Sequence, residues 1–324
     1  MRRDQPSGWK SAFQLALRAG ITGFLLWLAL RHVELRTLLQ QIASIDRQAI
    51  VYALVTFSLS IFVAALRWTT ILIALKNQRP VSVTYPISLI GAFFGQALPA
   101  GVGGDVVRVW LATRSGLSMR FAVSGILGDR LTGFLSILVI VTLELPQLRA
   151  LFHSSALFGG LLVVMIGGYC GLTIFMLLDK LPQSLQRFKI ARGFSAVSSD
   201  VRSALFSSFG PIVLAFGAAI QLLNVLVVFL LARGLHSPTS FFDCLLIVPF
   251  ANVLQTVPVS IAGWGVRESF FVTAFGLIGV AAPSALAISV LFGLLFLASS
   301  LPGGVLWLLQ GTGSPLKLRE AIKP

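Results

Sequence analysis

Charged side chains are scarce in this chain. They make up 11% of its 324 residues, whereas about a quarter of a typical soluble domain is charged. Hydrophobic residues make up 56%, and the mean hydropathy is +0.91. Apolar runs of roughly 20 residues recur, which is the length that a membrane-spanning helix needs. The composition therefore predicts an all-α polytopic membrane protein and excludes an ordinary soluble domain.

Cysteine and histidine are also scarce. Cys170 and Cys244 lie far apart in apolar segments, and the three histidines, His32, His153 and His236, fall at loops or expected helix ends. This spacing indicates neither a disulfide framework nor a zinc site. No cofactor and no metal are expected.

Negative charge is the scarcer sign, and the formal net charge is +14. The basic residues are not interleaved with aromatic ones as a nucleic-acid platform requires, so no nucleic-acid partner is expected. If the N-terminus is cytoplasmic, inside segments hold fifteen Lys and Arg and outside segments hold five. This positive-inside bias predicts that both termini are cytoplasmic.

Six unbroken apolar segments are long enough to cross a bilayer. The first follows a basic N-terminus but lacks a small-residue cleavage site, so we expect an uncleaved helix rather than a signal peptide. The six segments lie at about 11–30, 49–75, 121–143, 156–178, 210–232 and 283–309.

A thirteen-residue motif occurs twice. Gln96–Arg108 (QALPAGVGGDVVR) aligns without a gap with Gln255–Arg267 (QTVPVSIAGWGVR) at an offset of 159 residues, and five of the thirteen columns are identical. Each copy breaks an apolar region, at about 83–113 and about 241–278, with Pro and Gly, which disfavour helix interiors. Duplicated breaks of this kind indicate a transporter's binding site at the junction of two repeats.

The same offset relates the flanking spans. Shifted by 159 residues, the spans at 49–75 and 121–143 fall on those at 210–232 and 283–309. Each half thus has three spans and one broken region, and because three is odd the second half is expected to be inverted. The expected repeats are 1–155 and 156–324.

The broken regions have two interpretations. Irregular backbone at membrane depth is tolerated where it is buried in protein or lines a wet cavity, which favours two re-entrant hairpins that enter from opposite faces. A pair of ordinary short crossings is the alternative. Two connecting segments, about 35–45 and a basic one at about 185–205, have helical apolar stripes. The basic one would suit an anionic inner leaflet, and a plain solvated linker is the alternative.

Ionisable residues that remain inside the apolar regions are candidate functional groups, because each costs on the order of several kcal/mol there unless it faces a partner or a wet cavity. Asp105 and Arg108 have helical i, i+3 spacing and can pair; the sequence neighbours Asp129–Arg130 and Arg267–Glu268 are expected to pair elsewhere. Arg18 and Arg67 are the weakest candidates, since either could snorkel to the cytoplasmic face. The alternative is that all of them only hold helices together. They are Arg18, Arg67, Arg108, Arg130, Arg267, Asp105, Asp129 and Glu268.

Arg108 and Arg267 each follow a glycine-rich break where a new helix begins. The N–H groups of a helix N-terminus and an Arg side chain together form an anion site. Gln96 and Gln255 could donate amide hydrogen bonds there, or satisfy backbone groups freed by the prolines. The expected substrate is therefore an anion, and a membrane-embedded site suggests a phospholipid or polyprenyl-phosphate headgroup. The residues expected to shape the backbone are Pro99, Gly101, Gly103, Gly104, Pro258, Gly263 and Gly265.

Three motifs together resemble the lysylphosphatidylglycerol synthase transmembrane-region family, whose members include flippase domains. They are residues 98–108, the Gly-Asp-Arg of 128–130, and residues 258–268. The resemblance covers essentially the whole chain and implies movement of lipids or lipid-linked groups between leaflets of a bacterial cytoplasmic membrane. By matching positions it points to Asp105, Arg108, Asp129, Arg130, Arg267 and Glu268.

Full synthases of this family also carry a soluble domain that aminoacylates phosphatidylglycerol. This chain ends about fifteen residues after its last expected helix, so we expect a transporter and not an enzyme that makes lysyl-lipid.

Three functions fit the pattern. The first is a lipid translocase in which Arg108 and Arg267 hold a headgroup phosphate and Asp105, Asp129 or Glu268 carries protons. The second is an ion-coupled transporter of a small soluble anion. The third is a membrane-embedded lipid-modifying enzyme, although no histidine or metal-ligand cluster lies near the embedded acids.

Overall fold

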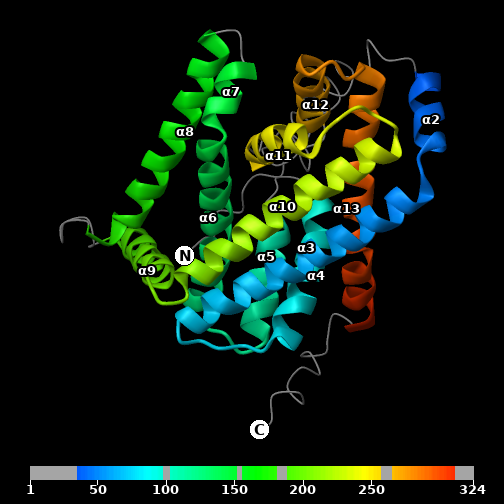
Figure 1. Ribbon diagram of the computed structural model, residues 1–324. Helices are drawn as coiled ribbons and strands as arrows, with labels where there is room; N and C mark the ends of the chain where they lie inside the picture. Colours follow the sequence, from blue (N-terminus) through cyan, green and yellow to red (C-terminus); the bar gives the residue numbers. More distant parts are fainter. Residues whose placement is uncertain (1–34, 98–102, 152–154, 181–187, 257–264, 311–324) are drawn as a thin grey trace, which may run out of the picture.

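The computed structural model describes residues 35–97, 103–151, 155–180, 188–256 and 265–310 (Figure 1). Within these ranges the chain forms α-helices, one short 3-10 helix and no strand. The all-α fold class is therefore confirmed for the part of the chain that the structure describes.

Five of the described helices are long and apolar enough to cross a membrane. They correspond to five of the six predicted spans and begin and end within a residue or two of them. The predicted span at 11–30 lies outside the described residues. The five helices are α3 (Arg47–Ala74), α6 (Met119–Leu143), α8 (Ser155–Met176), α10 (Gly210–Gly234) and α13 (Ala282–Gln310).

Each broken apolar region forms two shorter helices that pack against each other. The motif residues between the helices, 98–102 and 257–264, lie outside the described residues. The helices end where proline and clustered glycine were expected to end them. The first pair is α4 (Val81–Ala97) and α5 (Gly103–Arg114), and the second pair is α11 (Phe241–Thr256) and α12 (Val266–Leu277).

Short helices form the connections. The two segments with apolar stripes are helical, and α9 buries Val197 and Val201 while Phe188 and Phe194 stay exposed. The helix α7, directly after α6, was not predicted. These elements are α2 (Leu35–Ser44), α7 (Leu145–Leu151), the 3-10 helix Leu178–Lys180 and α9 (Lys189–Leu205).

The helices α3 and α10 lie side by side and run obliquely through the middle of the molecule (Figure 1). Their close approach depends on a small residue, because a Cβ atom at Gly234 would come within 2.5 Å of the Ala49 Cβ. Both helices also pack on α6. There Gly125 faces Trp68 and Leu72 of α3, so α3, α6 and α10 meet near the centre.

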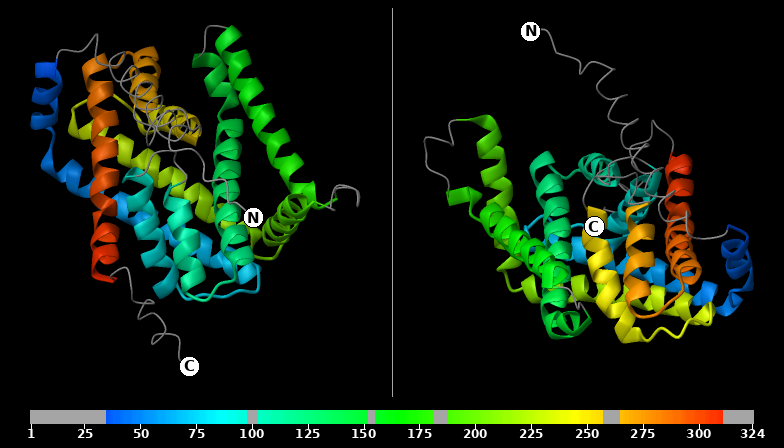
Figure 2. Two further views of the ribbon diagram at one scale, coloured as in Figure 1. Left: turned by 180° about the vertical axis from the view of Figure 1, so that it is seen from behind. Right: turned by 90° about the horizontal axis from the view of Figure 1, so that it is seen from above.

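The last helix, α13, contacts both helix pairs (Figure 2). Near its end Gly303 lies against the Leu89 carbonyl of α4. Nearer its start the Ser289 hydroxyl donates to Glu268 of α12 at 3.2 Å. Ser289 and Gly303 are about 21 Å apart along a helix axis at 1.5 Å per residue. The two pairs therefore dock at different levels of the molecule.

Gly303 provides a test of this packing. A Cβ atom there would overlap the Leu89 carbonyl oxygen, which is backbone and cannot rotate away. We expect Gly303→Ala to destabilise the protein by about 1–3 kcal/mol through overpacking, seen as a lower Tm in detergent. The control is Gly167→Ala on α8, where a Cβ meets nothing within 4 Å. An unchanged Tm in Gly303→Ala would contradict the close α4–α13 contact.

Candidate functional site

Asp129 of α6 lies between two arginines from other helices. The Arg67 Nε of α3 donates to its Oδ1 at 2.7 Å, and the Arg108 Nη1 of α5 donates to its Oδ2 at 2.9 Å. The side chains of Arg67, Arg108 and Asp129 are 9%, 12% and 6% exposed. A buried carboxylate with both oxygens bound to guanidinium groups ties three helices together.

The network continues toward the surface through a second carboxylate. Asp105 lies 3.5 Å from the Arg108 Nη1, as their i, i+3 spacing predicts, and it also accepts from the Nε of Arg130. The Arg130 side chain is 43% exposed, and it makes further interactions within the structure. We call these five residues the arginine–aspartate cluster: Arg67, Arg108, Arg130, Asp105 and Asp129.

Small residues let the helices of the cluster approach. A Cβ at Gly91 of α4 would overlap the side chain of Arg108, and a Cβ at Gly104 would overlap the Gly91 carbonyl. On α6, a Cβ at Gly133 would come within 3.1 Å of the Arg67 Nη1. Glycine at these positions thus makes room for two guanidinium groups inside the helix bundle.

The cluster carries more positive than negative charge. With all five groups ionised, three guanidinium groups face two carboxylates, so the net charge is +1. The Arg108 guanidinium also lies over the Trp68 ring, 4.7 Å from its centroid. Two buried N–H groups here, Arg108 Nε and Trp68 Nε1, have no hydrogen-bond partner in the described structure. The net positive charge and the unpaired N–H donors both favour the binding of an anion.

An apolar groove between α5 and α6 opens beside the cluster. Its volume is about 580 Å³, and Asp105 and Arg130 contribute to its lining. The groove extends toward the turn that joins the two helices, where Thr113 and Met119 line it. We call it the α5–α6 groove. Its apolar lining residues are Val106, Val109, Trp110, Met119, Val123, Ile126 and Leu127.

The second broken region forms a separate and more enclosed site. Arg267 and Glu268 at the start of α12 are 3% and 0% exposed. The Arg267 Nη2 donates to the Glu268 Oε1 at 2.6 Å, and the Arg267 Nε donates to the Ser289 hydroxyl of α13 at 3.1 Å. This site fastens α12 to α13, and neither residue lines the α5–α6 groove.

The expectation that Arg267 and Glu268 pair elsewhere is wrong, because Glu268 folds back over its own helix start. Its Oε2 accepts from the Gly265 N–H at 2.5 Å, and Gly265 has φ +86°, a conformation that favours glycine. This bond to the N-cap N–H leaves the other carboxylate oxygen facing Arg267. By contrast, Asp129 and Arg130 do pair elsewhere, as predicted.

Arg67 was underestimated by sequence reasoning. Snorkelling to the cytoplasmic face is wrong for it, because it is 7% exposed and bound to Asp129. Hydropathy shows that an arginine interrupts an apolar helix but not which residue of another helix meets it. The sequence signal available was the excess of Arg over acid among the embedded residues, which indicated that an embedded acid could serve more than one cation.

The remaining predicted residues lie around the two breaks. Gln96 is partly buried near the end of α4, Gly103 begins α5, and Gly104 is buried against α4. Gln255 is on α11, and its side chain is not described. The others lie outside the described residues: Arg18, Pro99, Gly101, Pro258 and Gly263. Within the described ranges, no group of three or more His, Cys, Asp or Glu is placed to hold a metal ion.

The chain belongs to the family described as the lysylphosphatidylglycerol synthase transmembrane region. The family model matches residues 15–303, which include all five members of the arginine–aspartate cluster and both breaks. No curated protein matches the chain. The family assignment, together with five apolar helices of spanning length, makes this a multi-pass membrane protein.

Asp129→Asn tests the cluster. Removing the shared charge leaves two buried guanidinium groups without their counter-ion, which typically costs about 3–5 kcal/mol for a buried pair. We expect a clearly lower Tm in detergent. Asp46→Asn is the matched control, because Asp46 is exposed and caps α3 by accepting from the Gln48 N–H, and Asn caps helices as well as Asp. Equal Tm values for both variants would show that Asp129 does not bind the helices together.

Proposed function

We propose that the protein is a lipid translocase that moves an anionic phospholipid or lipid-linked headgroup between leaflets. The observation that carries this proposal is the adjacency of a cationic cluster and an apolar groove. Arg130 and Asp105 line the same α5–α6 groove as Val106, Trp110 and Met119. An amphiphile with an anionic head and an alkyl chain matches both parts of this site.

The depth of the charged end supports a lipid over a soluble ligand. Arg130 lies about 17 Å along α6 from Met119 at 1.5 Å per residue, which is roughly half of a 30 Å hydrocarbon core. A soluble anion gains nothing from the apolar wall that leads there. An acyl chain in that groove stays in an apolar medium while its headgroup reaches the guanidinium groups.

The side chains of the arginine–aspartate cluster become less exposed from Arg130 inward, and they form a path for the headgroup. Exposure falls from 43% at the Arg130 side chain to 15% at Asp105 and 6% at Asp129. Asp105 is shared by Arg130 and Arg108, so a phosphate can replace it first at the outer guanidinium and then at the inner one. Asp105 can stay paired with one arginine while the phosphate binds the other, so neither the arginines nor the carboxylate is left uncompensated.

The orientation follows from the basic residues. The N-terminal end of α6 contacts α9, where Arg120 and Asp200 form a bidentate pair at 2.7 and 2.9 Å. We place this end, with the basic helix α9, at the cytoplasmic face of a bacterial membrane, and both termini on that side. The groove then receives lipid from the inner leaflet.

Inverted repeats and re-entrant hairpins are part of the same proposal. Three features support them: the duplicated motif, the paired short helices on either side of each break, and the docking of the two pairs at different levels of α13. Rocking of one half against the other would then open the cluster alternately to each leaflet. In this proposal Arg267 and Glu268 hold α12 of the second pair against α13, and the direct binding of substrate by Arg267 stays a prediction.

Arg130→Gln tests the proposed function. Purified protein in phosphatidylcholine vesicles is supplied with a fluorescent phosphatidylglycerol, and a membrane-impermeant reductant reports how fast the label changes leaflets. We expect at least about a tenfold loss of rate, since a charge-assisted contact contributes about 1.5–3 kcal/mol. The protein should stay folded, because Arg130 is 43% exposed.

Arg120→Gln is the matched control. Arg120 is also on α6, is 54% exposed and pairs with an aspartate, but it does not line the groove. It should keep the wild-type rate. Equal rates in the two variants would remove the groove as the lipid site. Uptake of a soluble anion such as glycerol phosphate, with no movement of the labelled lipid, would replace the translocase with a soluble-anion transporter.

A further inference from the structure

Glu144 is a buried acid that the cluster does not use. It follows the last residue of α6 and precedes the first residue of α7. The residue is 7% exposed, and neither carboxyl oxygen has a hydrogen-bond partner in the described structure. Most buried polar side chains have at least one partner, so this carboxyl group needs an explanation.

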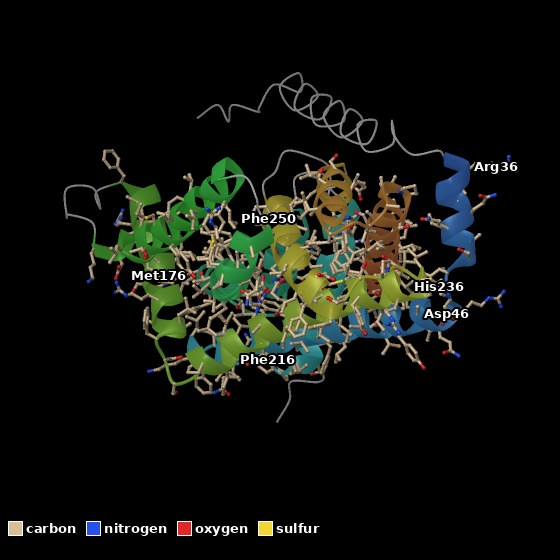
Figure 3. The ribbon with its side chains drawn as sticks, turned by 45° about the horizontal axis from the view of Figure 1, so that its top comes forward. Arg36, Asp46, Met176, Phe216, His236 and Phe250 are labelled. Atoms are coloured by element: carbon tan, nitrogen blue, oxygen red, sulfur yellow. The ribbon has the colours of Figure 1, made fainter. Side chains whose placement is uncertain are left out.

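The surroundings of Glu144 are apolar. A cluster of buried side chains joins the end of α6 to α7, α8 and α11, and it includes Val141, Leu148, Leu161 and Met165. Phe250 of α11 packs against the same cluster (Figure 3). These residues can offer neither a hydrogen bond nor a counter-charge to a carboxylate.

The charged groups and the tyrosine on the packed elements make other contacts. On α7 the Arg149 guanidinium lies over the Phe158 ring, 5.2 Å from its centroid. On α8 the Tyr169 hydroxyl pairs with the Thr142 hydroxyl at 2.8 Å. On α11 the Asp243 carboxylate accepts from the backbone and side chain of Ser240. His153, in the connection between α7 and α8, lies outside the described residues.

An ionised carboxylate is energetically unfavourable in a buried apolar environment. The effective cost of burying an uncompensated ion is several kcal/mol, and a group in that position binds a proton instead. Burial accordingly raises the pKa of Glu144 from 4.5 to about 8. The carboxyl group is therefore neutral at pH 7 and becomes ionised when water reaches it.

We propose that Glu144 is a proton-binding site whose protonation is linked to lipid translocation. It holds a proton while the α6–α7 junction is closed and releases that proton to water when the junction opens. The inference rests on the proposed function and names the residue that makes it depend on pH. One proton is bound and one is released per cycle at the same end of α6, with no other reactant.

Helix α6 connects Glu144 to the arginine–aspartate cluster. Glu144 ends the helix that carries Asp129 and Arg130, and it lies about 21 Å from Arg130 along the axis at 1.5 Å per residue. A tilt of α6 that rearranges the arginine–aspartate cluster also moves Glu144. Asp105, Asp129 and Glu268 are less suited to carry a proton, because each is bound to at least one guanidinium group.

Infrared spectroscopy tests the proton site without any transport. The sequence has four glutamates, Glu34, Glu144, Glu268 and Glu320, so the protein can be labelled with carboxyl-¹³C glutamate. We expect a protonated-glutamate band at pH 7 that titrates near pH 8, is absent in Glu144→Gln and is unchanged in the control Asp243→Asn. A wild-type band that is already lost when the pH is raised to 6 would overturn the proposal.

The pH dependence of thermal stability provides a second test, and its direction can be predicted. Because the folded-state pKa of Glu144 is raised from 4.5 to about 8, the wild type loses stability as pH rises through this range. Glu144→Gln lacks that loss, so its Tm should exceed that of the wild type by more at pH 9 than at pH 5. Glu144→Leu serves as a second variant. A Tm difference from wild type that is the same at both pH values in both variants would overturn the proposal.

The pH dependence of lipid transport distinguishes the proton-site proposal from the translocase proposal on which it rests. With a pKa of about 8, the protonated fraction falls about tenfold between pH 6 and pH 9. The ratio of labelled-phosphatidylglycerol rates at these two pH values should approach one in Glu144→Gln but not in wild type. A titrating band without lipid movement at any pH would leave the proton site and remove the translocase. Lipid movement with the wild-type pH ratio in Glu144→Gln would leave the translocase and remove the proton site.

Discussion

A carboxylate held between two guanidinium groups inside the membrane is the interaction on which the rest of the structure depends. Charge at that depth is tolerated only when it is compensated, so Arg67, Arg108 and Asp129 must meet wherever their helices run. The glycines at 91, 104 and 133 clear the space for that meeting. The crossing of α3, α5 and α6 is thus set by electrostatics first and completed by apolar packing around it.

Both broken regions place an arginine and a carboxylate at the start of a short helix, but the two sites differ in exposure. In the first, the charges extend outward from Asp129 to the half-exposed Arg130 at the edge of an apolar groove. In the second, Arg267 and Glu268 are enclosed, with the carboxylate also capping its own helix. Under the proposed mechanism this asymmetry corresponds to one state of an alternating transporter, with its first half open toward a leaflet and its second half closed.

Hydropathy alone located the five described spans and the two pairs of short helices, because long apolar runs and proline–glycine breaks are local properties. The residue with which a charged side chain pairs is not determined by the local sequence. Arg67 was treated as able to snorkel, and Glu268 was expected to pair away from Arg267, because the contacts with α6 and the cap at Gly265 cannot be read from the linear sequence. Glu144 lies just past the predicted span 121–143, and the sequence does not show that it is buried at the end of α6, where α7, α8 and α11 pack.

The central claim is that the groove beside the arginine–aspartate cluster holds a lipid by its head and by a chain. The most direct measurement is a cryo-EM map of the protein in nanodiscs that contain phosphatidylglycerol. The account predicts a phosphate within hydrogen-bonding distance of Arg130 and continuous acyl-chain density between α5 and α6. An α5–α6 groove closed by protein side chains, or a phosphate bound only at a site away from Arg130 and Arg108, would contradict it.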